Sequence, residues 1–224
     1  MSIQSIIKYA STIEIDRRRV IGVQTTRNQQ QRITETVTLN PWKFIIEVAA
    51  ALPYNQARSI IEQLDQLDRG NPEIIQFSHS GMTWLFDYQG AMSPAQVQQI
   101  TVAGFSGNQL ILQNLPTISQ QAVMFEPGDI LQIGSNPHPL SVRSQVLRGT
   151  NNTVTITTHR NNFLGSVANQ SITVGNDCSF RVFCPNMPVY RLLPGAFYYN
   201  SLGEKKNGAR IEWSDSFRLQ EWIE

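Results

Sequence analysis

Apolar and polar residues alternate with a period of two along most of the chain. The pattern is clearest from Trp42 to Leu52, where apolar residues take the even positions and Lys43 and Glu47 take odd ones. Because successive side chains of a strand point to opposite faces of a sheet, this spacing predicts a strand with one buried face. Residues 33–39 alternate in the same way, with threonine recurring at every second position, and predict another strand.

One segment has a helical spacing instead. Between residues 54 and 69, apolar residues recur every three or four positions and polar residues fill the remaining faces. Gly70 follows where a helix commonly ends in a left-handed residue, and Asn71-Pro72 prevents the helix from resuming. The sequence therefore predicts one helix over residues 54–69, with a core-facing set of Ala57, Ile60, Ile61, Leu64 and Leu67.

The middle of the chain predicts many short strands. After strand-like alternation at residues 73–77 and 82–88, residues 89–98 are rich in Gly, Ser, Pro and Gln and are typical of a linker. Five or six short strands then follow within about eighty residues, and they favour a small closed barrel because closure removes the open edges of a sheet. These strands are expected at residues 99–103, 109–113, 129–133, 140–147, 153–158 and 172–174.

The C-terminal segment returns to longer strands. They are too few to form a domain alone, but pairing with the N-terminal strands would bury their apolar faces. The middle block would then be an insertion, so the sequence predicts a mainly β fold with a discontinuous domain of residues 1–98 and 184–224 and an inserted barrel domain of residues 99–183. The C-terminal strands are expected at residues 189–193, 196–199, 210–213 and 217–223, with an exposed hairpin tip at residues 203–208.

Composition argues against several classes of function. Eighteen basic residues against seventeen acidic ones leave a net charge of +1, so no overall field would attract nucleic acid or an anionic membrane. The one compact basic cluster, Arg17-Arg18-Arg19, is more typical of an exposed edge or an interface rim. No apolar run approaches the length needed to cross a bilayer, and Met1–Ala10 lacks the pattern of a signal peptide.

The sequence lacks recognisable catalytic and metal-binding motifs. Its three histidines, at positions His79, His138 and His159, have no spacing that pairs them with other ligands. The two cysteines, Cys178 and Cys184, are expected as reduced thiols, and a disulfide between them remains open. We therefore expect no enzyme activity, no cofactor, no catalytic residue and no metal site. The carboxylates from which a glycoside-hydrolysing pair could be assembled include Asp87, Asp129 and Asp177.

Three segments, in this order along the chain, resemble the distal tail proteins of long-tailed phages and the related baseplate hub proteins. The first, residues 42–70, is a tryptophan-containing strand followed by a proline and an amphipathic helix that ends in glycine. The second, residues 125–133, is a strand with a Gly-Asp turn, and the third, residues 213–221, is the C-terminal strand. The resemblance extends from Thr34 onward, whereas residues 1–33 match no motif of the family.

The resemblance implies a β-sandwich domain with one helix and an inserted barrel of the oligonucleotide- and oligosaccharide-binding (OB) type. In the family, the sandwich forms homo-oligomeric rings, commonly hexamers, that continue the tail tube and contact the hub or tail-fibre proteins. The chain would then be a structural virion protein of the tail tip or baseplate, assembled in the host cytoplasm. Its partners would be copies of itself, the tail tube protein and the baseplate hub or tail-fibre proteins, with no membrane and with DNA only as cargo passing through the lumen.

Two other functions are compatible with the sequence. A carbohydrate-binding module would use the inserted barrel, because barrels of this kind bind oligosaccharides and because Trp84 and Tyr88 precede the first barrel strand. A cell-wall hydrolase would use the scattered carboxylates. The missing motifs favour a structural protein over the hydrolase.

Overall fold

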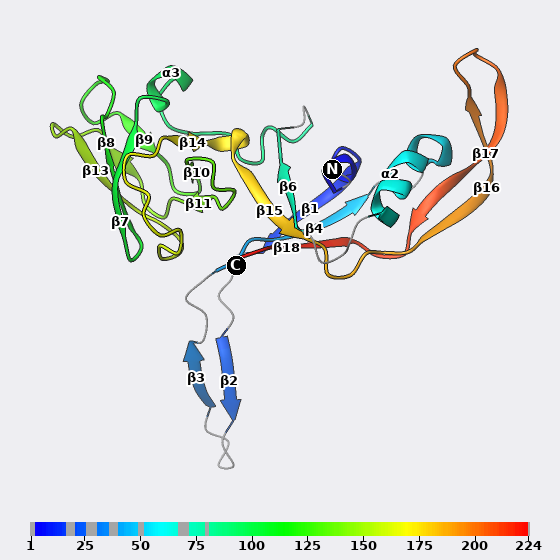
Figure 1. Cartoon of the computed structure of the whole chain (residues 1–224), viewed down its shortest axis with the longest axis horizontal. Coiled ribbons are helices and arrows are strands. Elements are labelled where there is room, and N and C mark those ends of the chain that lie inside the picture. The colour runs from blue at the N-terminus through cyan, green and yellow to red at the C-terminus, as the bar shows by residue number, and fades with distance from the viewer. Residues whose placement is uncertain are drawn as a thin grey trace. The chain divides into compact units, whose positions relative to one another are not determined.

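Figure 1 shows the chain as a computed structural model, in which residues 3–16, 21–25, 31–35, 40–48, 52–66, 72–78 and 81–223 are described. The fold is mainly β, with 44% strand and 12% helix, which confirms the predicted fold class. The chain divides into two compact units. Unit 1 consists of Met1–Asp16, Pro41–Ile75 and Arg181–Glu224, and unit 2 consists of Arg17–Asn40 and Gln76–Phe180.

Unit 1 is built from both ends of the chain. Its helices are α1 (Ile3–Ile7) and α2 (Tyr54–Gln66). The smaller of its sheets has the strand order β16 (Tyr190–Tyr199), β17 (Lys205–Trp213) and β5 (Leu52–Pro53). The larger has the order β1 (Ala10–Asp16), β4 (Lys43–Val48), β18 (Phe217–Glu221), β15 (Ser179–Phe183) and β6 (Glu73–Gln76).

Strand β4 is the strand with the clearest alternation in the sequence. Trp42, Phe44 and Ile46 are fully buried, whereas Glu47 is exposed, so the predicted buried face is confirmed. Strand β18 pairs antiparallel with β4, placing Phe217 opposite Ile46 and Leu219 opposite Phe44. The predicted pairing of C-terminal with N-terminal strands is therefore confirmed, and it joins segments on either side of residues 76–180, the larger part of unit 2.

The predicted helix is confirmed as α2 over Tyr54–Gln66, and residues 67–70 lie outside the described residues. The apolar face of α2 packs against β5 and the C-terminal half of β17, in the smaller sheet of unit 1. Ala57 and Ile61 from α2 form a buried cluster with Leu52 from β5 and Ile211 from β17. The three- and four-residue spacing thus identified a core-facing helix, as its amphipathic pattern predicts.

Strands β16 and β17 form a long antiparallel hairpin. The sequence pattern predicts two strands over residues 189–199, but the structure has one strand with an irregularity between Pro194 and Ala196. Gly195 lies there with a left-handed φ of +97°, which glycine adopts without steric strain. The tip also differs from the expected residues 203–208, because β17 begins at Lys205. Asn200 forms the turn, and its side-chain oxygen accepts hydrogen bonds from the backbone N–H groups of Leu202 and Glu204.

Unit 2 holds most of the short strands. One sheet has the order β13 (Thr153–Thr157), β8 (Gln109–Gln113), β7 (Thr101–Ser106). A second has the order β11 (Leu140–Ser141), β10 (Ile130–Ile133), β14 (Ile172–Val174), and a third pairs β12 (Val146–Leu147) with β9 (Val123–Phe125). A further two-stranded sheet pairs β2 (Ile21–Thr25) with β3 (Gln31–Glu35), and residues 36–39 of the predicted threonine-rich strand lie outside the described residues.

One hydrophobic core lies among the short strands of unit 2. Leu110, Leu112, Phe125, Leu131 and Ile156 are all fully buried in it. None of the sheets formed by the described strands closes into a barrel, which differs from the predicted closed barrel. The strands are only two to six residues long, and isolated bridges, between Thr101 and Ser171 and between Val142 and Thr158, link the sheets in place of continuous ladders. These bridges and the shared apolar core join the sheets.

The division between the units falls at Gln76 and Phe180, not at residues 99 and 183 as the sequence pattern predicts. Aromatic packing explains the difference. Phe77 and Phe86 pack against Phe180, with ring centroids 5.6 and 5.5 Å from that of Phe180. Met92 and Val97 are buried in the core of unit 2. Residues 77–98 therefore belong to unit 2.

Within this segment two sequence predictions are wrong. Residues 81–86 form turns instead of a strand, with Met82 and Phe86 buried and Trp84 exposed. Residues 89–98 are not a linker, because they contain the short helix α3 (Pro94–Val97). Ser93 caps α3 in a reciprocal capping box with Gln96, a pattern in which each side chain bonds the other residue's backbone N–H.

Candidate functional site

The histidines named in the sequence have structural contacts where they are described. His159 is buried, and its Nδ1 accepts a hydrogen bond of 2.9 Å from the backbone N–H of Ser141. The buried His138 packs against the edge of Phe163, over which the guanidinium of Arg160 also lies. His79 lies outside the described residues. No group of three or more His, Cys, Asp or Glu side chains within the described part of the chain could hold a metal ion.

Both cysteines are buried free thiols. Burial raises the pKa of the Cys178 thiol and of the Cys184 thiol above the ordinary value. Because the thiolate is the nucleophile, a raised pKa keeps both groups in the unreactive protonated form. The Sγ of Cys178 lies 3.4 Å from the carbonyl oxygen of Thr173, which gives that thiol a structural contact.

Two of the three candidate carboxylates line one cavity in unit 2. The cavity has a volume of about 430 Å³ and lies among α3, β14, the 3-10 helix η1 (Gly175–Asp177) and residues 87–92. Asp87 and Asp177 are its acidic lining residues. The remaining lining residues are Tyr88, Met92, Pro94, Val97, Gln98, Ile172, Thr173, Val174, Gly175 and Asn176.

Asp129, the third candidate carboxylate, holds the backbone together instead of lining this cavity. Its Oδ1 accepts a 2.9 Å hydrogen bond from the N–H of Gln89, and its Oδ2 accepts a 2.8 Å bond from the N–H of Glu126. Burial raises the pKa of the Asp129 carboxyl above its ordinary value, and the nearby Glu126 and Asp87 carboxylates raise it further. The two N–H donors oppose this rise. Asp129 therefore fixes the segment from which Asp87 and Tyr88 reach the cavity.

The raised pKa of Asp129 predicts a pH dependence of stability. Because the folded state binds the Asp129 proton more tightly than the unfolded state, the free energy of unfolding should fall as pH rises from 3.8 through the folded-state pKa. Asp129→Asn removes this titration, so its unfolding free energy should depend less on pH in that window. Urea unfolding of both proteins at a series of pH values measures the difference. Equal slopes would contradict the assignment.

Tyr88 forms one wall of the cavity and is anchored in the core. Its hydroxyl donates a hydrogen bond to the carbonyl oxygen of Met124, and its ring packs edge-on against Phe125, with centroids 6.1 Å apart. Burial raises the pKa of the Tyr88 hydroxyl, so this group remains a neutral hydrogen-bond donor. Gly90 lies against this arrangement, since a side chain there would collide with the Tyr88 hydroxyl and with Met124.

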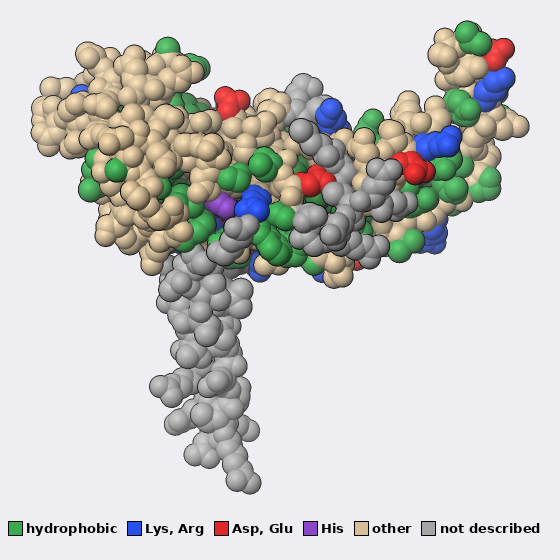
Figure 2. Space-filling model, viewed as in Figure 1, with side chains coloured by type: hydrophobic (Ala, Val, Ile, Leu, Met, Phe, Trp, Pro, Cys, Tyr) green, Lys and Arg blue, Asp and Glu red, His purple; other side chains and the backbone are tan. Residues whose placement is uncertain are grey.

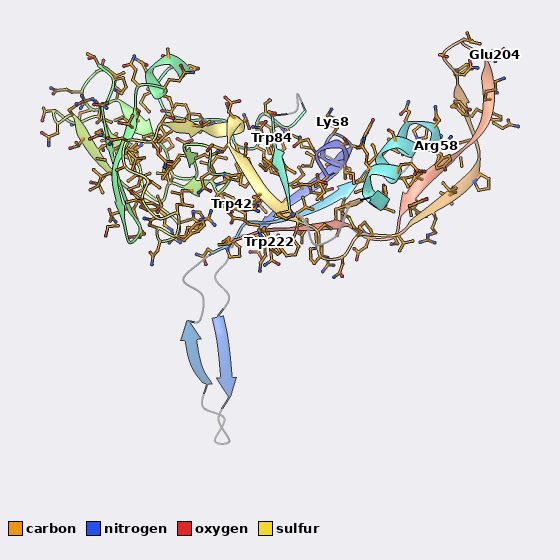
Figure 3. All side chains as sticks on the ribbon, in the orientation of Figure 1. Lys8, Trp42, Arg58, Trp84, Glu204 and Trp222 are labelled. Atoms are coloured by element: carbon orange, nitrogen blue, oxygen red, sulfur yellow. The ribbon has the colours of Figure 1, made fainter. Side chains whose placement is uncertain are left out.

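Trp84 lies on the turn that is bonded to the cavity wall. The side-chain amide of Asn176, a lining residue, donates to the carbonyl oxygen of Thr83. The indole Nε1 of Trp84 donates a 3.0 Å hydrogen bond to the carbonyl oxygen of Gly81, which orients the ring. Trp84 nevertheless remains 72% exposed. Figure 3 labels it beside the yellow segment that contains η1.

A second cavity, of about 390 Å³, lies in unit 1. It is lined by Ser11, Glu47, Val48, Trp213, Asp215 and Ser216. Its acidic residues come from β4 and from the turn between β17 and β18, and the sequence named none of them as candidates. It contains one half-buried aromatic residue, Trp213, whose ring packs against Phe217 with centroids 5.0 Å apart. The cavity in unit 2 is larger than this one and is lined by two carboxylates named from the sequence, so we take it as the candidate site.

No protein-family model matches the chain, and no curated protein sequence matches it. Sequence reasoning named Asp87, Asp177, Trp84 and Tyr88. The structure places Asp87, Tyr88 and Asp177 in the lining of one cavity of unit 2, whereas Trp84 is not a lining residue and lies on the turn whose Thr83 carbonyl is bonded to Asn176. Sequence reasoning missed Asn176, which lies in a 3-10 turn without a sequence motif. The capping box of Ser93 and Gln96 was a usable signal for the helix that contributes other parts of the wall.

None of the helices in the described ranges is long and apolar enough to cross a membrane.

Proposed function

We propose that this chain is a structural subunit of a phage tail tip, of the distal tail or baseplate hub type. Its copies form a ring, commonly of six subunits, that joins the tail tube to the hub or fibre proteins in the virion. The proposal rests on the ordered sequence resemblance and on one structural observation. That observation is the hairpin of β16 and β17, which leaves an apolar face exposed.

The strand register defines the two faces of the hairpin. Directly opposite residues share a face, and Leu192 is opposite Ile211, whereas Phe197 is opposite Asn207 and Tyr199 is opposite Lys205. We call this side the apolar face; it carries Tyr190, Leu192, Pro194, Phe197, Tyr199, Ala209, Ile211 and Trp213, together with Asn207 and Lys205 near the tip. The Lys205 ammonium lies 3.9 Å from the centroid of the Phe197 ring. The other face carries the ion pair between Arg191 and Glu212, together with Arg210 and Lys206. The hairpin is thus amphipathic at its base, whereas toward the tip polar residues lie among the aromatic ones on this face.

Only the base of the apolar face is covered within unit 1. Ile211 is buried against α2, and Tyr190 and Trp213 pack beside it. Farther along the same face, Phe197 is 57% exposed and Tyr199 is 69% exposed. Hydrophobic side chains are visible along this hairpin in Figure 2. Contiguous exposed apolar residues of this kind mark interaction surfaces in soluble proteins.

The hairpin also has an open strand edge. In the sheet of described strands, β16 is the edge strand and pairs with β17 alone. An edge strand presents unpaired N–H and C=O groups that a neighbouring chain can bond. A ring needs each subunit to offer two different complementary surfaces, because its contacts are head-to-tail. An amphipathic hairpin with a free edge can supply one of them, which supports a ring-forming subunit.

A charged residue on the apolar face should prevent ring assembly. Phe197→Glu replaces an aromatic ring of the proposed contact, over which the Lys205 ammonium lies, with a charged carboxylate, and we expect the dissociation constant of that contact to rise about 30-fold or more, as for an interface hot spot. Tyr198→Glu is the matched control, because Tyr198 lies on the opposite face, across from Lys206. Negative-stain electron microscopy and sedimentation velocity would measure the assembly state.

Closed rings of the wild type and of Tyr198→Glu, with monomers of Phe197→Glu, would support the proposal. A wild type that is strictly monomeric and absent from purified virions would overturn it. Rings that persist unchanged in Phe197→Glu would show that the hairpin is not the contact.

A further inference from the structure

We propose that the cavity of unit 2 binds an alkylammonium group, which is an aliphatic chain that ends in a primary amine. A small free amine and the lysine side chain of a partner protein both carry this group. The proposal goes beyond a structural role in a ring, and it does not depend on ring formation. It rests on a cavity that combines an apolar lining with two unpaired carboxylates.

The cavity has room for an aliphatic chain and an apolar lining to receive it. Its volume of about 430 Å³ falls within the range of roughly 300–1,000 Å³ that is common for ligand pockets. Burial of methylene groups against apolar side chains is favourable because it removes apolar surface from water. The apolar lining residues come from residues 88–92, from α3 and from β14, and they are Tyr88, Met92, Pro94, Val97, Ile172 and Val174.

Two carboxylates in the lining are free to pair with a cation. Asp87 and Asp177 both line the cavity, and none of the lining residues is Lys or Arg. Neither carboxylate group has an ion pair or a hydrogen-bond donor within the described residues. Because an ammonium is positively charged and carries only donors, it can form charge-assisted hydrogen bonds with both carboxylates.

Neighbouring carboxylates add to the negative potential of this region. Burial raises the pKa of the Asp129 carboxyl, and repulsion by the Glu126 and Asp87 carboxylates raises it further. Asp87 and Asp129 are therefore close enough to repel each other. Asp87, Glu126, Asp129 and Asp177 are the four acidic residues of the sequence between residues 76 and 180. All four thus line the cavity or interact with a residue that lines it.

The basic residues of the same segment do not line the cavity. Residues 76–180 contain three arginines and no lysine, and each arginine donates to a backbone carbonyl oxygen. Arg143 donates to His159, Arg148 to Pro116 and Arg160 to Pro139. A cation that neutralises Asp87 and Asp177 would therefore come from a ligand rather than from this segment.

The same charges disfavour anions, and the number of ligands disfavours metal ions. A phosphate or carboxylate ligand would meet Asp87 and Asp177 without a compensating cation, which costs binding free energy. No group of three or more His, Cys, Asp or Glu side chains in the described ranges could hold a metal ion, whereas Ca²⁺ takes about six to eight oxygen ligands. An ammonium needs far fewer acceptors.

Parts of the cavity wall are fixed before binding. Gln89 and Ala91 donate backbone hydrogen bonds to Asp129 and to the carbonyl oxygen of Val123, and these bonds hold the segment next to Asp87. Gly175 has a left-handed φ of +70° and lies so close to the carbonyl oxygen of Phe86 that an added Cβ would be 3.0 Å from it. A preformed wall reduces the conformational entropy lost on binding.

The test titrates the isotope-labelled full chain with pentylammonium and follows the backbone amide signals by NMR. The signals of Asp87 and Gly175 should shift as the site fills. The double variant Asp87→Asn with Asp177→Asn should weaken binding by about fivefold or more, because it removes both charged partners of the ammonium. Asp215→Asn with Glu62→Gln is the matched control, since it makes the same change in net charge at exposed residues of unit 1, and it should bind as the wild type does.

A series of amines from methylammonium to pentylammonium distinguishes the cavity from a charged surface. Each methylene that enters the cavity should tighten binding by about two- to fourfold, whereas an exposed carboxylate pair would bind all of these amines equally. Pentanol has the same chain without the charge and should bind at least about fivefold more weakly than pentylammonium.

Nα-acetyl-lysine N-methylamide presents the same group from a peptide backbone. Binding as tight as that of pentylammonium would assign the site to a lysine side chain of a partner protein, and much weaker binding would assign it to a small free amine. Phe197→Glu should keep the binding of pentylammonium, which separates this site from ring assembly. Any of four results would overturn the proposal: no binding of pentylammonium at millimolar concentration, an affinity independent of chain length, equal binding of pentanol, or unchanged binding in the double variant.

Discussion

Replacing Trp42 with alanine should lower the free energy of unfolding by about 4 kcal/mol, because truncating a buried tryptophan removes its packing and leaves a cavity. Trp42 is fully buried, and its ring stacks on Phe44 with a centroid distance of 6.0 Å. Its backbone also exchanges hydrogen bonds with Glu221. The Trp42 N–H donates to the carboxylate at 2.9 Å, and the N–H of Glu221 donates to the Trp42 carbonyl at 2.8 Å. The residue therefore lies where β4 meets the C-terminal strand β18, and Figure 3 labels it at the start of β4.

Urea unfolding followed by circular dichroism would measure this loss. Trp84→Ala is the matched control, because it makes the same chemical change at a site that is 72% exposed. We expect it to change the unfolding free energy by no more than about 0.5 kcal/mol, as for most surface substitutions. If Trp42→Ala does not yield soluble protein, Trp42→Phe should still show a loss larger than that control. Equal effects at positions 42 and 84 would contradict the packing described for unit 1.

A methyl group at position 90 should have the next largest effect. Gly90→Ala places a Cβ inside contact distance of the Tyr88 hydroxyl and of the Met124 carbonyl oxygen, which are themselves hydrogen-bonded to each other. Relief requires Tyr88 to move away from its partner, leaving that buried carbonyl without its hydrogen bond. Overpacking and the lost bond together should destabilise the protein by about 3 kcal/mol.

Thermal or urea unfolding would again measure the change. Gly149→Ala is the matched control, because an added Cβ there meets nothing within 4 Å. It should leave stability nearly unchanged, or raise it by a few tenths of a kcal/mol, since alanine restricts the unfolded chain. A Gly90→Ala protein as stable as Gly149→Ala would show that the backbone near Tyr88 can yield without loss.

Local periodicity carried the parts of the fold that could be predicted from sequence. The alternation around Phe44 indicates the buried face of one strand, and the helical spacing around Ile61 indicates the buried face of one helix. Each of these predictions needs only the residues of the element itself. The pairing of β4 with β18 was predicted from a different consideration, namely that the C-terminal strands needed partners to bury their apolar faces. That reasoning does not require knowledge of the intervening residues.

Residues 77–98 could not be predicted in the same way. Their positions depend on Phe77 and Phe86 meeting Phe180, which lies about a hundred positions along the chain from Phe77. The alternation of Met82, Trp84 and Phe86 matches a strand, but tertiary packing buries only the outer two and leaves Trp84 exposed. The local sequence pattern of residues 77–98 contains no information on their contact with Phe180.

The same limit applies to the candidate site. Asp87 and Asp177 were named only as members of a scattered set of carboxylates, and the fold places them around one cavity. Asp129 belonged to the same set, yet its two backbone hydrogen bonds make it a structural residue. Residue type suggested all three equally, and only burial and geometry separate their roles.

The bulge at Gly195 affects the direction of the hairpin but not which residues lie on each of its faces. Leu192 and Phe197 lie on one face although they are an odd number of residues apart, because the extra residue shifts the phase of alternation between Pro194 and Ala196. A chain without Gly195 would therefore keep the same residues on the apolar face. It would lose the local bend and added twist that a bulge gives to its strand. Which residues the hairpin carries on its apolar face and the direction in which the strand carries them are consequently two separable properties of this hairpin.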